Sequence, residues 1–310
     1  MKELPVPTWD LSPATHAPAW WRKPLKKAKQ NWGRPALAEK TPALPPVIVP
    51  IPHSAPVEQP KVAPAPALKV QWAKHLDEVR AAQRLRHDVF VGEMGATIPT
   101  TLRGHDIDLF DDFCEHLLVR DGATGEAVGT YRVLTPAQAR RVGGLYTATE
   151  FDLVRLRHLR PQMVELGRSC VHPDYRSGAV MMALWGALAE FMGRNQLDVM
   201  VGCASIPMAH KGLPLGHAAA SIWQQVRQTH LADIAYQVTP RCALPIDDLQ
   251  SDAVVEPPAL VKGYLRLGAR VLGAPAWDPD FQTADLPMMM RVQDLPGRFR
   301  RIFDDATKCA

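Results

Sequence analysis

No apolar run in the sequence approaches the roughly 20 residues that a helix needs to span a bilayer. The N-terminal segment lacks a continuous apolar stretch with a small-residue cleavage site, so nothing predicts secretion. The five cysteines form no CxxC pair, which argues against a zinc site or a disulfide framework. GxSxG and Walker A motifs are absent, so serine hydrolase and P-loop chemistry find no support. We expect a cytoplasmic protein with reduced thiols and no metal.

Glycine is absent from residues 35–68, which hold ten of the 29 prolines, and this composition predicts an extended segment without a core. Residues 1–68 contain nine Lys and Arg against four Asp and Glu, whereas residues 69–310 contain 27 against 28. With 46% apolar residues, the chain has enough material for a sizeable core. We therefore predict a disordered, proline-rich tail over residues 1–68 and a folded domain over residues 69–310.

Residues 20–34 combine three Trp with six basic residues and no acidic residue. This composition suits the surface of an anionic membrane, because basic side chains are attracted to it and Trp favours the interface. A solvated tail is the alternative. Nucleic acid is not an expected partner, since the folded part is nearly neutral and a basic tail alone gives only nonspecific contact. We expect possible contact with the inner face of the cytoplasmic membrane through this segment.

Strand-like and helix-like segments alternate along the folded part. Strands are predicted at residues 68–73, 116–120, 127–135, 163–171, 199–206 and 281–292, and helices at 77–94, 179–191 and 257–271. The second and third strands flank a turn-forming sequence, which predicts a hairpin. This order predicts the α/β (α+β) class, with a mixed central sheet flanked by helices.

Charged residues occur where apolar segments are expected. The predicted strand 163–171 carries Glu165 and Arg168, and a carboxylate on such a strand should have a raised pKa. Other charges in or beside apolar segments are Arg86, Asp108, Asp111 and Arg132. A mutually paired set is tolerable in a core and commonly marks a pocket for a charged substrate. A purely structural ion-pair network is the alternative for the same set.

Several motifs resemble those of known acyltransferases. Residues 163–192 resemble the acyl-donor segment of the GNAT superfamily, which implies a GNAT-like fold. Four motifs, in order, are similar to those of acyl-homoserine-lactone synthases: Arg86-His-Asp-Val-Phe90, Asp108-Leu-Phe-Asp111, Gly129-Thr-Tyr-Arg-Val-Leu-Thr-Pro136 and Glu165-Leu-Gly-Arg168. Gly167 replaces the serine that is usual in the last of these motifs.

The span from about residue 70 to residue 303 most resembles the bacterial ornithine-lipid N-acyltransferases. The matching stretches are residues 85–95, 144–152, 165–179, 202–205 and 262–269. The resemblance implies transfer of a 3-hydroxyacyl chain from acyl carrier protein to the α-amine of L-ornithine, the first step of ornithine lipid biosynthesis. The carrier-protein thioester is then a co-substrate, and no cofactor is expected.

The resemblance also implies roles for individual residues. Glu165 and Arg168 are the candidate catalytic residues, with Glu165 accepting the amine proton. Arg168, Arg132 and Arg86 are expected to hold the substrate carboxylate or organise acidic residues. Asp108 and Asp111 are expected to receive the second ammonium. Candidate donor-binding residues are Cys170, Val171, Arg176, Gly178 and Ala179. An apolar acyl pocket is expected from Met181, Met182, Trp185 and Met192, and a basic docking face from Arg155, Arg157, Arg160, Arg176 and Arg194.

Two other functions are compatible with these residues. The first is a related enzyme with another amino acid acceptor, or a synthase of the acyl-homoserine-lactone type. The second is an acyl-binding or regulatory module that keeps the fold without turnover. An intact Glu165 with its arginines favours an enzyme over the module.

Overall fold

The computed structural model describes residues 67–249 and 253–297, which fold around a mixed eight-stranded sheet. The strand order is β1-β2-β3-β5-β6-β10-β8, and β9 also pairs with β10. The strands are β1 Leu68–Trp72, β2 Glu115–Asp121, β3 Ala127–Leu134, β5 Met163–Val171, β6 Val199–Pro207, β8 Arg270–Val271, β9 Ala276–Asp278 and β10 Thr283–Arg291. A separate short pair is formed by β4 (Phe151–Asp152) and β7 (Thr239–Pro240). The predicted mixed sheet and the β2–β3 hairpin are therefore present.

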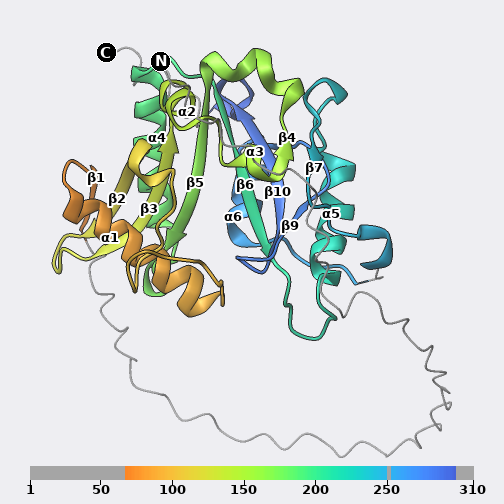
Figure 1. The fold of residues 1–310 in the computed structure, drawn as a ribbon, viewed down its shortest axis with the longest axis horizontal. Helices are drawn as coiled ribbons and strands as arrows, with labels where there is room; N and C mark the ends of the chain where they lie inside the picture. The colour runs from red at the N-terminus through yellow and green to blue at the C-terminus, as the bar shows by residue number, and fades with distance from the viewer. Residues whose placement is uncertain (1–66, 250–252, 298–310) are drawn as a thin grey trace, which may run out of the picture. The chain divides into compact units, whose positions relative to one another are not determined.

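Helices cover both faces of this sheet (Figure 1). They are α1 Leu76–His87, α2 Pro136–Val142, α3 Thr147–Glu150, α4 Ala179–Arg194, α5 His217–His230 and α6 Ala259–Arg266, and α1 continues into a π-helical turn over Asp88–Glu93. Single 3₁₀ turns or short 3₁₀ segments lie at Asp111–Phe113, Val154–Gln162, Pro173–Tyr175, Ile234–Tyr236, Ile246–Leu249 and Val292–Asp294. One face of β2 and β3 packs against α4, whereas α1 contacts β3 and β5.

The short helices α2 and α3 were not predicted, and two further helical regions differ from the sequence prediction. The helix expected at residues 257–271 ends at Arg266, because Gly268 adopts a left-handed φ of 91° and β8 begins at Arg270. The helix α5 was not predicted, although its alanines and Trp223 pack closely against β6 and β10. Both differences lie on the side of the sheet away from the hairpin.

The central strands β5 and β6 pair in parallel over only three residues, from Met163↔Val199 to Glu165↔Val201. Both strands continue to their own ends, and they diverge along this length (Figure 1). A Cβ atom at Gly202 would collide with the carbonyl oxygen of Leu166, so glycine permits close approach where the ladder ends. Since β5 still pairs with β3, and β6 with β10, the divergence opens a space inside a continuous sheet.

The predicted tail over residues 1–68, including residues 20–34, lies almost entirely outside the described residues, and β1 begins at Leu68. Its disorder and its membrane contact stay predictions. Within residues 67–249 and 253–297, no helix combines the length and apolar character needed to cross a membrane.

Candidate active site

A cavity of about 640 Å³ occupies the space between the diverging strands. Residues 166–171 of β5 form one wall, and the opposite wall is formed by Cys203, Ser205 and Asp285 of β6 and β10. This volume lies in the usual range for a small-molecule or cofactor site. Divergence of two paired strands therefore provides a site at the centre of the sheet.

One end of the cavity is apolar. Met181, Met182 and Trp185 of α4 line it, together with Leu260 and Tyr264 at α6. This arrangement agrees with three of the four residues expected for an acyl pocket. The fourth, Met192, is only 1% exposed and packs in the core between α4 and the sheet.

Beside the cavity, Arg86 is fully buried and holds two aspartates. Its Nη1 and Nη2 donate to the two carboxylate oxygens of Asp111, each at 2.8 Å, and its Nε donates to Asp106 Oδ2 at 2.7 Å. Bidentate pairing of this kind is the strong form of an arginine–carboxylate interaction. Asp106 was not identified from the sequence, because it lies in a loop without a motif.

Two further arginines complete this network. Arg132 Nη1 donates to Asp108 and to Asp111, the latter at 3.1 Å. Arg168 Nε donates to Asp106 at 3.2 Å, and its Nη2 donates to Asp108 at 3.1 Å. Although burial opposes the shift, the Arg86 hydrogen bonds and the nearby arginine charges lower the pKa of Asp111. We call these three arginines and three aspartates the Arg/Asp network, and their formal charges cancel.

Arg168 is held in an unusual conformation. Its φ of 51° lies in the left-handed region, which is strained for a residue with a side chain. Its guanidinium lies over the rings of Tyr146 and Phe281, with 4.8 Å and 4.6 Å from Cζ to the ring centroids. The strand β5 is irregular here, since its register against β3 shifts between Thr130 and Arg132. The irregularity places a cation on the cavity wall.

Glu165 lies at the last paired position of β5 and β6 and lines the cavity. Its Oε2 accepts from the backbone N–H of Tyr146 at 2.7 Å, and its Oε1 accepts from that of Thr147 at 2.6 Å. The Thr147 hydroxyl donates to Oε1 as well. Burial raises the pKa of Glu165, although these hydrogen bonds favour the charged form. Glu165 is thus near the Arg/Asp network without a salt bridge to it among the described residues.

The predicted donor-binding residues lie near the end of β5. Cys170, Val171, Arg176 and Gly178 line the cavity, whereas Ala179 is the first residue of α4 and is not part of the lining. Gly178 has a φ of 102°, a conformation that glycine adopts without strain. Arg176 is already paired with Glu93 through two contacts of 2.6 Å and donates to the Val171 carbonyl at 3.1 Å.

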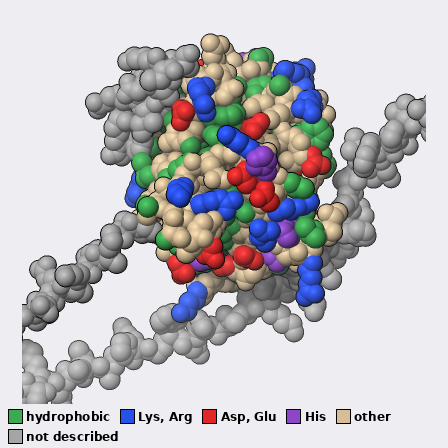
Figure 2. Space-filling view, turned by 90° about the vertical axis from the view of Figure 1, so that its left-hand side faces the viewer, with side chains coloured by type: hydrophobic (Ala, Val, Ile, Leu, Met, Phe, Trp, Pro, Cys, Tyr) green, Lys and Arg blue, Asp and Glu red, His purple; other side chains and the backbone are tan. Residues whose placement is uncertain are grey.

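The five arginines expected to form one docking face lie at opposite ends of β5. Arg155, Arg157 and Arg160 precede the strand. Arg194 belongs to the same end, because Asp198, four residues later, donates its backbone N–H to the carbonyl of Gln162 at 3.1 Å. Arg176 follows the strand, whose nine residues span about 30 Å. Arg176 therefore does not share a face with the other four arginines, which lie at the same end of β5. On the β1 side of the molecule, acidic and basic side chains are interspersed (Figure 2).

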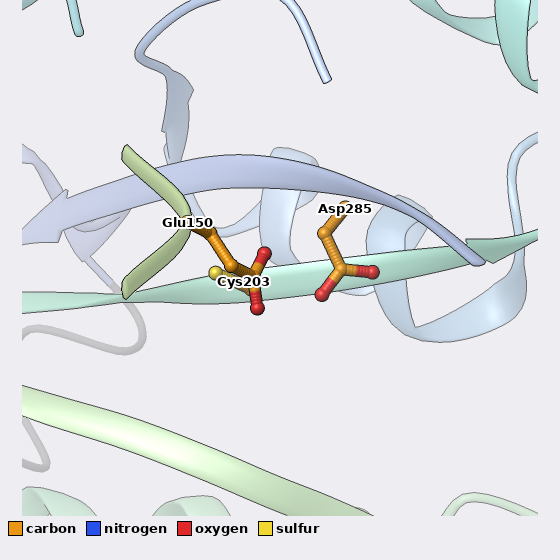
Figure 3. Close-up of side chains that lie close together, drawn as sticks. All are labelled: Glu150, Cys203 and Asp285. Carbon is orange, nitrogen blue, oxygen red and sulfur yellow. The ribbon is translucent and has the colours of Figure 1, made fainter. Parts of the chain in front are cut away.

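A second acidic group was missed from the sequence. Glu150 of α3, Cys203 of β6 and Asp285 of β10 point toward one another (Figure 3). One carboxylate oxygen of each acid and the Cys203 Sγ all lie within 4.8 Å of one another. Burial, followed by the charges of Asp285 and Asp278, raises the pKa of Glu150 to about 9. Burial, followed by the charge of Asp278, raises the pKa of Asp285 to about 6. We call Glu150, Asp278 and Asp285 the carboxylate pocket.

Comparison with known proteins identifies the class and then the family. The acetyltransferase (GNAT) domain family matches residues 85–186, so the predicted GNAT-like fold and acyltransferase class are confirmed. The L-ornithine N(alpha)-acyltransferase of Brucella abortus is 35% identical over 248 residues, covering 75% of this chain and 87% of that protein. That of Agrobacterium fabrum is 34% identical over 253 residues, covering 75% and 83%. The chain therefore belongs to the L-ornithine N(alpha)-acyltransferase family.

Solved structures are more distant. The CoA-dependent acyl-homoserine lactone synthase BjaI aligns with 78% of this chain and 90% of its own, at 16% identity and a TM-score of 0.46.

Proposed function

We propose that this protein transfers a 3-hydroxyacyl chain from acyl carrier protein to the α-amine of L-ornithine, as the first step of ornithine lipid biosynthesis. The observation that carries this proposal is a cavity with an apolar end at α4 and α6 and an acidic wall at β10. An acyl chain suits the first environment, and a diamino acid suits the second. The names of the relatives support ornithine as the acceptor.

The chemistry requires a neutral amine beside a thioester carbonyl. In our proposal Glu165, directly or through water, accepts one proton from the α-ammonium, and the amine attacks the carbonyl carbon. A C–N bond then forms, the C–S bond breaks, and the second proton lost by the nitrogen is taken up by the carrier-protein thiolate, which leaves as a thiol. The β6-facing edge of β5 beyond Glu165 has no strand partner in the described part of the chain, and its N–H groups are candidates to stabilise the oxyanion.

The donor arm is proposed to lie along the same edge, beside Cys170 and Val171. An extended group with amides can pair with an open strand edge. The phosphate of the arm would then reach Gly178 and Ala179, where the first N–H groups of α4 favour an anion. Arg176 would contribute positive charge while it stays paired with Glu93.

The Arg/Asp network is proposed to position residues around the acceptor. Arg86 is completely buried and does not line the cavity, and both oxygens of Asp111 accept from arginines. These two residues therefore suit the role of organising the site better than direct binding. Arg132 and Arg168 do line the cavity, so we assign the substrate carboxylate to them.

A small polar group interrupts the apolar end of the cavity. The hydroxyls of Tyr131 and Tyr264 are hydrogen-bonded to each other, and the buried Ser169 hydroxyl lies beside both without good hydrogen-bond geometry to either. All three residues line the cavity. A buried hydroxyl without a partner is costly, so we propose that this group receives the 3-hydroxyl of the acyl chain.

The function is tested by offering purified protein 3-hydroxyacyl carrier protein and measuring thiol release. L-ornithine, lysine, glycine, glutamine and adenosylmethionine are added separately, and mass spectrometry identifies the product. Ornithine-dependent release with an N-acylornithine product supports the proposal. Thiol release with another acceptor would assign that acceptor as the substrate. The absence of thiol release with every acceptor would favour the acyl-binding module. Membrane contact is tested separately by sedimentation with anionic vesicles, with and without residues 20–34.

A further inference from the structure

We propose that the carboxylate pocket is the subsite for the side-chain ammonium of the acceptor, so that it selects a diamino acid over a neutral one. The inference rests on the proposed function for its choice of acceptor. It assigns the ammonium to residues outside the motifs from which the acceptor site was first predicted. Three observations carry it: the position of the pocket, its missing hydrogen bonds and its missing counter-charge.

The pocket lies on the wall of the cavity opposite β5. Asp278 and Asp285 line the cavity, and Glu150 approaches Asp285 from the end of α3 (Figure 3). It also adjoins the proposed proton acceptor. Cys203 lies beside Thr147, with 3.9 Å from Sγ to Oγ1, and the Thr147 hydroxyl donates to Glu165. A diamino acid can therefore present one nitrogen to Glu165 and the other to the pocket.

Glu150 and Asp285 have few hydrogen-bond donors, whereas Asp278 Oδ1 accepts from the backbone N–H groups of Asp280 and Phe281 at 2.9 Å and 3.1 Å. Both oxygens of Glu150 are buried, and its nearby side-chain donors in the described residues, the Tyr146 hydroxyl and the Cys203 thiol, lie outside good hydrogen-bond geometry. Asp285 is only 4% exposed, and its Oδ1 accepts from Thr283 Oγ1 at 2.8 Å. Oxygen atoms without donors in a low-dielectric site are costly. An ammonium group carries three donors and satisfies several such oxygens at once.

The pocket also lacks a counter-charge of its own. Within residues 67–249 and 253–297, neither Glu150 nor Asp278 nor Asp285 takes part in a salt bridge. Arg168 is the nearby cation, and it is engaged by Asp106 and Asp108. The ligand-free protein accommodates the like charges by holding protons, as the raised pKa values of Glu150 and Asp285 indicate. A cationic ligand would replace those protons.

A metal ion is the competing occupant, because Glu150, Cys203 and Asp285 present possible ligand atoms. Two features favour an ammonium. Burial and the neighbouring carboxylates raise the pKa of the Cys203 thiol well above its usual value, which opposes a thiolate ligand. The pocket also opens into a cavity large enough for an organic substrate, where an ammonium can arrive as part of the acceptor.

The test compares L-ornithine with L-norvaline, which has the same carbon chain without the δ-amine. Binding of each to the whole chain is measured by calorimetry, with and without acyl carrier protein. Wild-type protein should prefer ornithine, and Asp285→Asn should reduce this preference by about tenfold or more, the loss expected for a hydrogen bond to a charged group. Glu150→Gln should act in the same direction. Asp198→Asn, which removes an exposed carboxylate before β6, serves as the matched control.

Folding of the variants is checked by thermal unfolding. Replacing Glu150 by Gln should leave the melting temperature unchanged or raise it, because Gln is neutral without the proton that buried Glu150 must take up on folding. If Asp285→Asn and Glu150→Gln kept the wild-type preference for ornithine over norvaline, the assignment of the subsite would be overturned. Equal binding of both amino acids by wild-type protein would overturn it as well. Tight binding of Zn²⁺ alone that Asp285→Asn abolishes, without a change in ornithine preference, would assign the pocket to a metal.

Thiol release from the carrier protein separates this inference from the proposed function. A chain that binds ornithine through the carboxylate pocket but releases no thiol would refute the function and support the subsite. A chain that acylates ornithine with unchanged preference in both variants would support the function and refute the subsite.

Discussion

The Arg/Asp network and the carboxylate pocket are two buried charged groups beside the same cavity, and they differ in charge balance. The network matches three arginines with three aspartates through direct hydrogen bonds. The pocket holds carboxylates without a basic partner in the described residues. A balanced group can stabilise a fold by itself, whereas an unbalanced group has a cost that a ligand can offset. The pocket is therefore the group that gains more from a cationic ligand, whereas Arg132 and Arg168 of the balanced network also face the cavity.

Among the tests of this comparison, substitution of Arg86 should have the largest effect. Arg86→Ala leaves Asp106 and Asp111 buried without their main partner, so we expect a loss of about 3–5 kcal/mol in the free energy of unfolding. Urea unfolding monitored by circular dichroism measures this loss. Arg84→Ala, on the exposed side of the same helix, is the control. A loss no larger than that of the control would show that the network contributes little to stability.

A second test concerns Glu165, which adjoins both groups. If Glu165 accepts the amine proton, Glu165→Gln should lower kcat by about a hundredfold or more, because a general base contributes on that order. Single-turnover transfer from the carrier protein to ornithine measures the effect. Gln cannot accept all three hydrogen bonds, so the melting temperature is recorded in parallel. A small change in kcat with a large fall in melting temperature would assign Glu165 to anchoring α3 alone.

Paired substitutions sharpen the comparison directly. Asp111→Asn deprives Arg86 and Arg132 of a counter-charge and should cost about 3 kcal/mol of stability or more. Asp285→Asn removes a charge without a basic partner and should cost less or increase stability. Denaturant midpoints of the two variants, measured at neutral pH, test the contrast. Equal losses would contradict the distinction based on charge balance.

The two groups should also respond oppositely to pH. The pKa of Asp111 is lowered in the folded state, so its contribution is present at neutral pH and is lost as pH falls below about 4. Glu150 and Asp285 have folded pKa values of about 9 and about 6, so their contribution is present near pH 4. It is lost as pH rises through those values.

Melting temperatures of ligand-free protein between pH 5 and pH 9 measure the second effect. We expect a decline toward high pH that is smaller in Glu150→Gln, because this variant removes the group with the highest pKa of the pair. Equal declines in the variant and in wild-type protein would show that other groups determine the pH dependence.

The smallest expected effect is at an uncharged polar group. Tyr264→Phe removes one hydroxyl from the group proposed to receive the 3-hydroxyl, and it should reduce the preference for 3-hydroxyacyl over acyl donors by about twofold to tenfold. Competition between the two carrier-protein thioesters measures the preference. Tyr236→Phe is a matched control, because Tyr236 lies outside the cavity lining. An unchanged preference would leave the hydroxyl unassigned.

Local sequence pattern was sufficient for six of the eight strands of the sheet and for five of the six residues of the network, whereas β8, β9 and Asp106 were missed. The strand at residues 163–171 was predicted with its observed bounds, and Glu165 and Arg168 were recognised as charges in an apolar segment. Asp285 shows the same pattern in β10, where it follows Thr283 and precedes a run of methionines. It was missed because no motif pointed to it. The feature of the sequence that could have identified Asp285 is a charged residue within a buried strand.

The carboxylate pocket could not be assembled from sequence spacing. Glu150 and Asp285 are far apart in the chain. They meet across Cys203 because β6 pairs with β10 and also contacts α3. Single-sequence patterns predict local periodicity, but they do not determine which strands become neighbours. Asp106 was missed for a related reason, since its role depends on the packing of a loop against α1.

The short ladder between β5 and β6 has a mechanical consequence. It joins two half-sheets, β1-β2-β3-β5 and β6-β10-β8, through three residue pairs that end at Val201, just before Gly202. A thioester arm inserted beyond this seam would act as an additional strand and couple the two halves. The enzyme would then be stiffest when loaded with donor, and release of the thiol would return the seam to its weaker state.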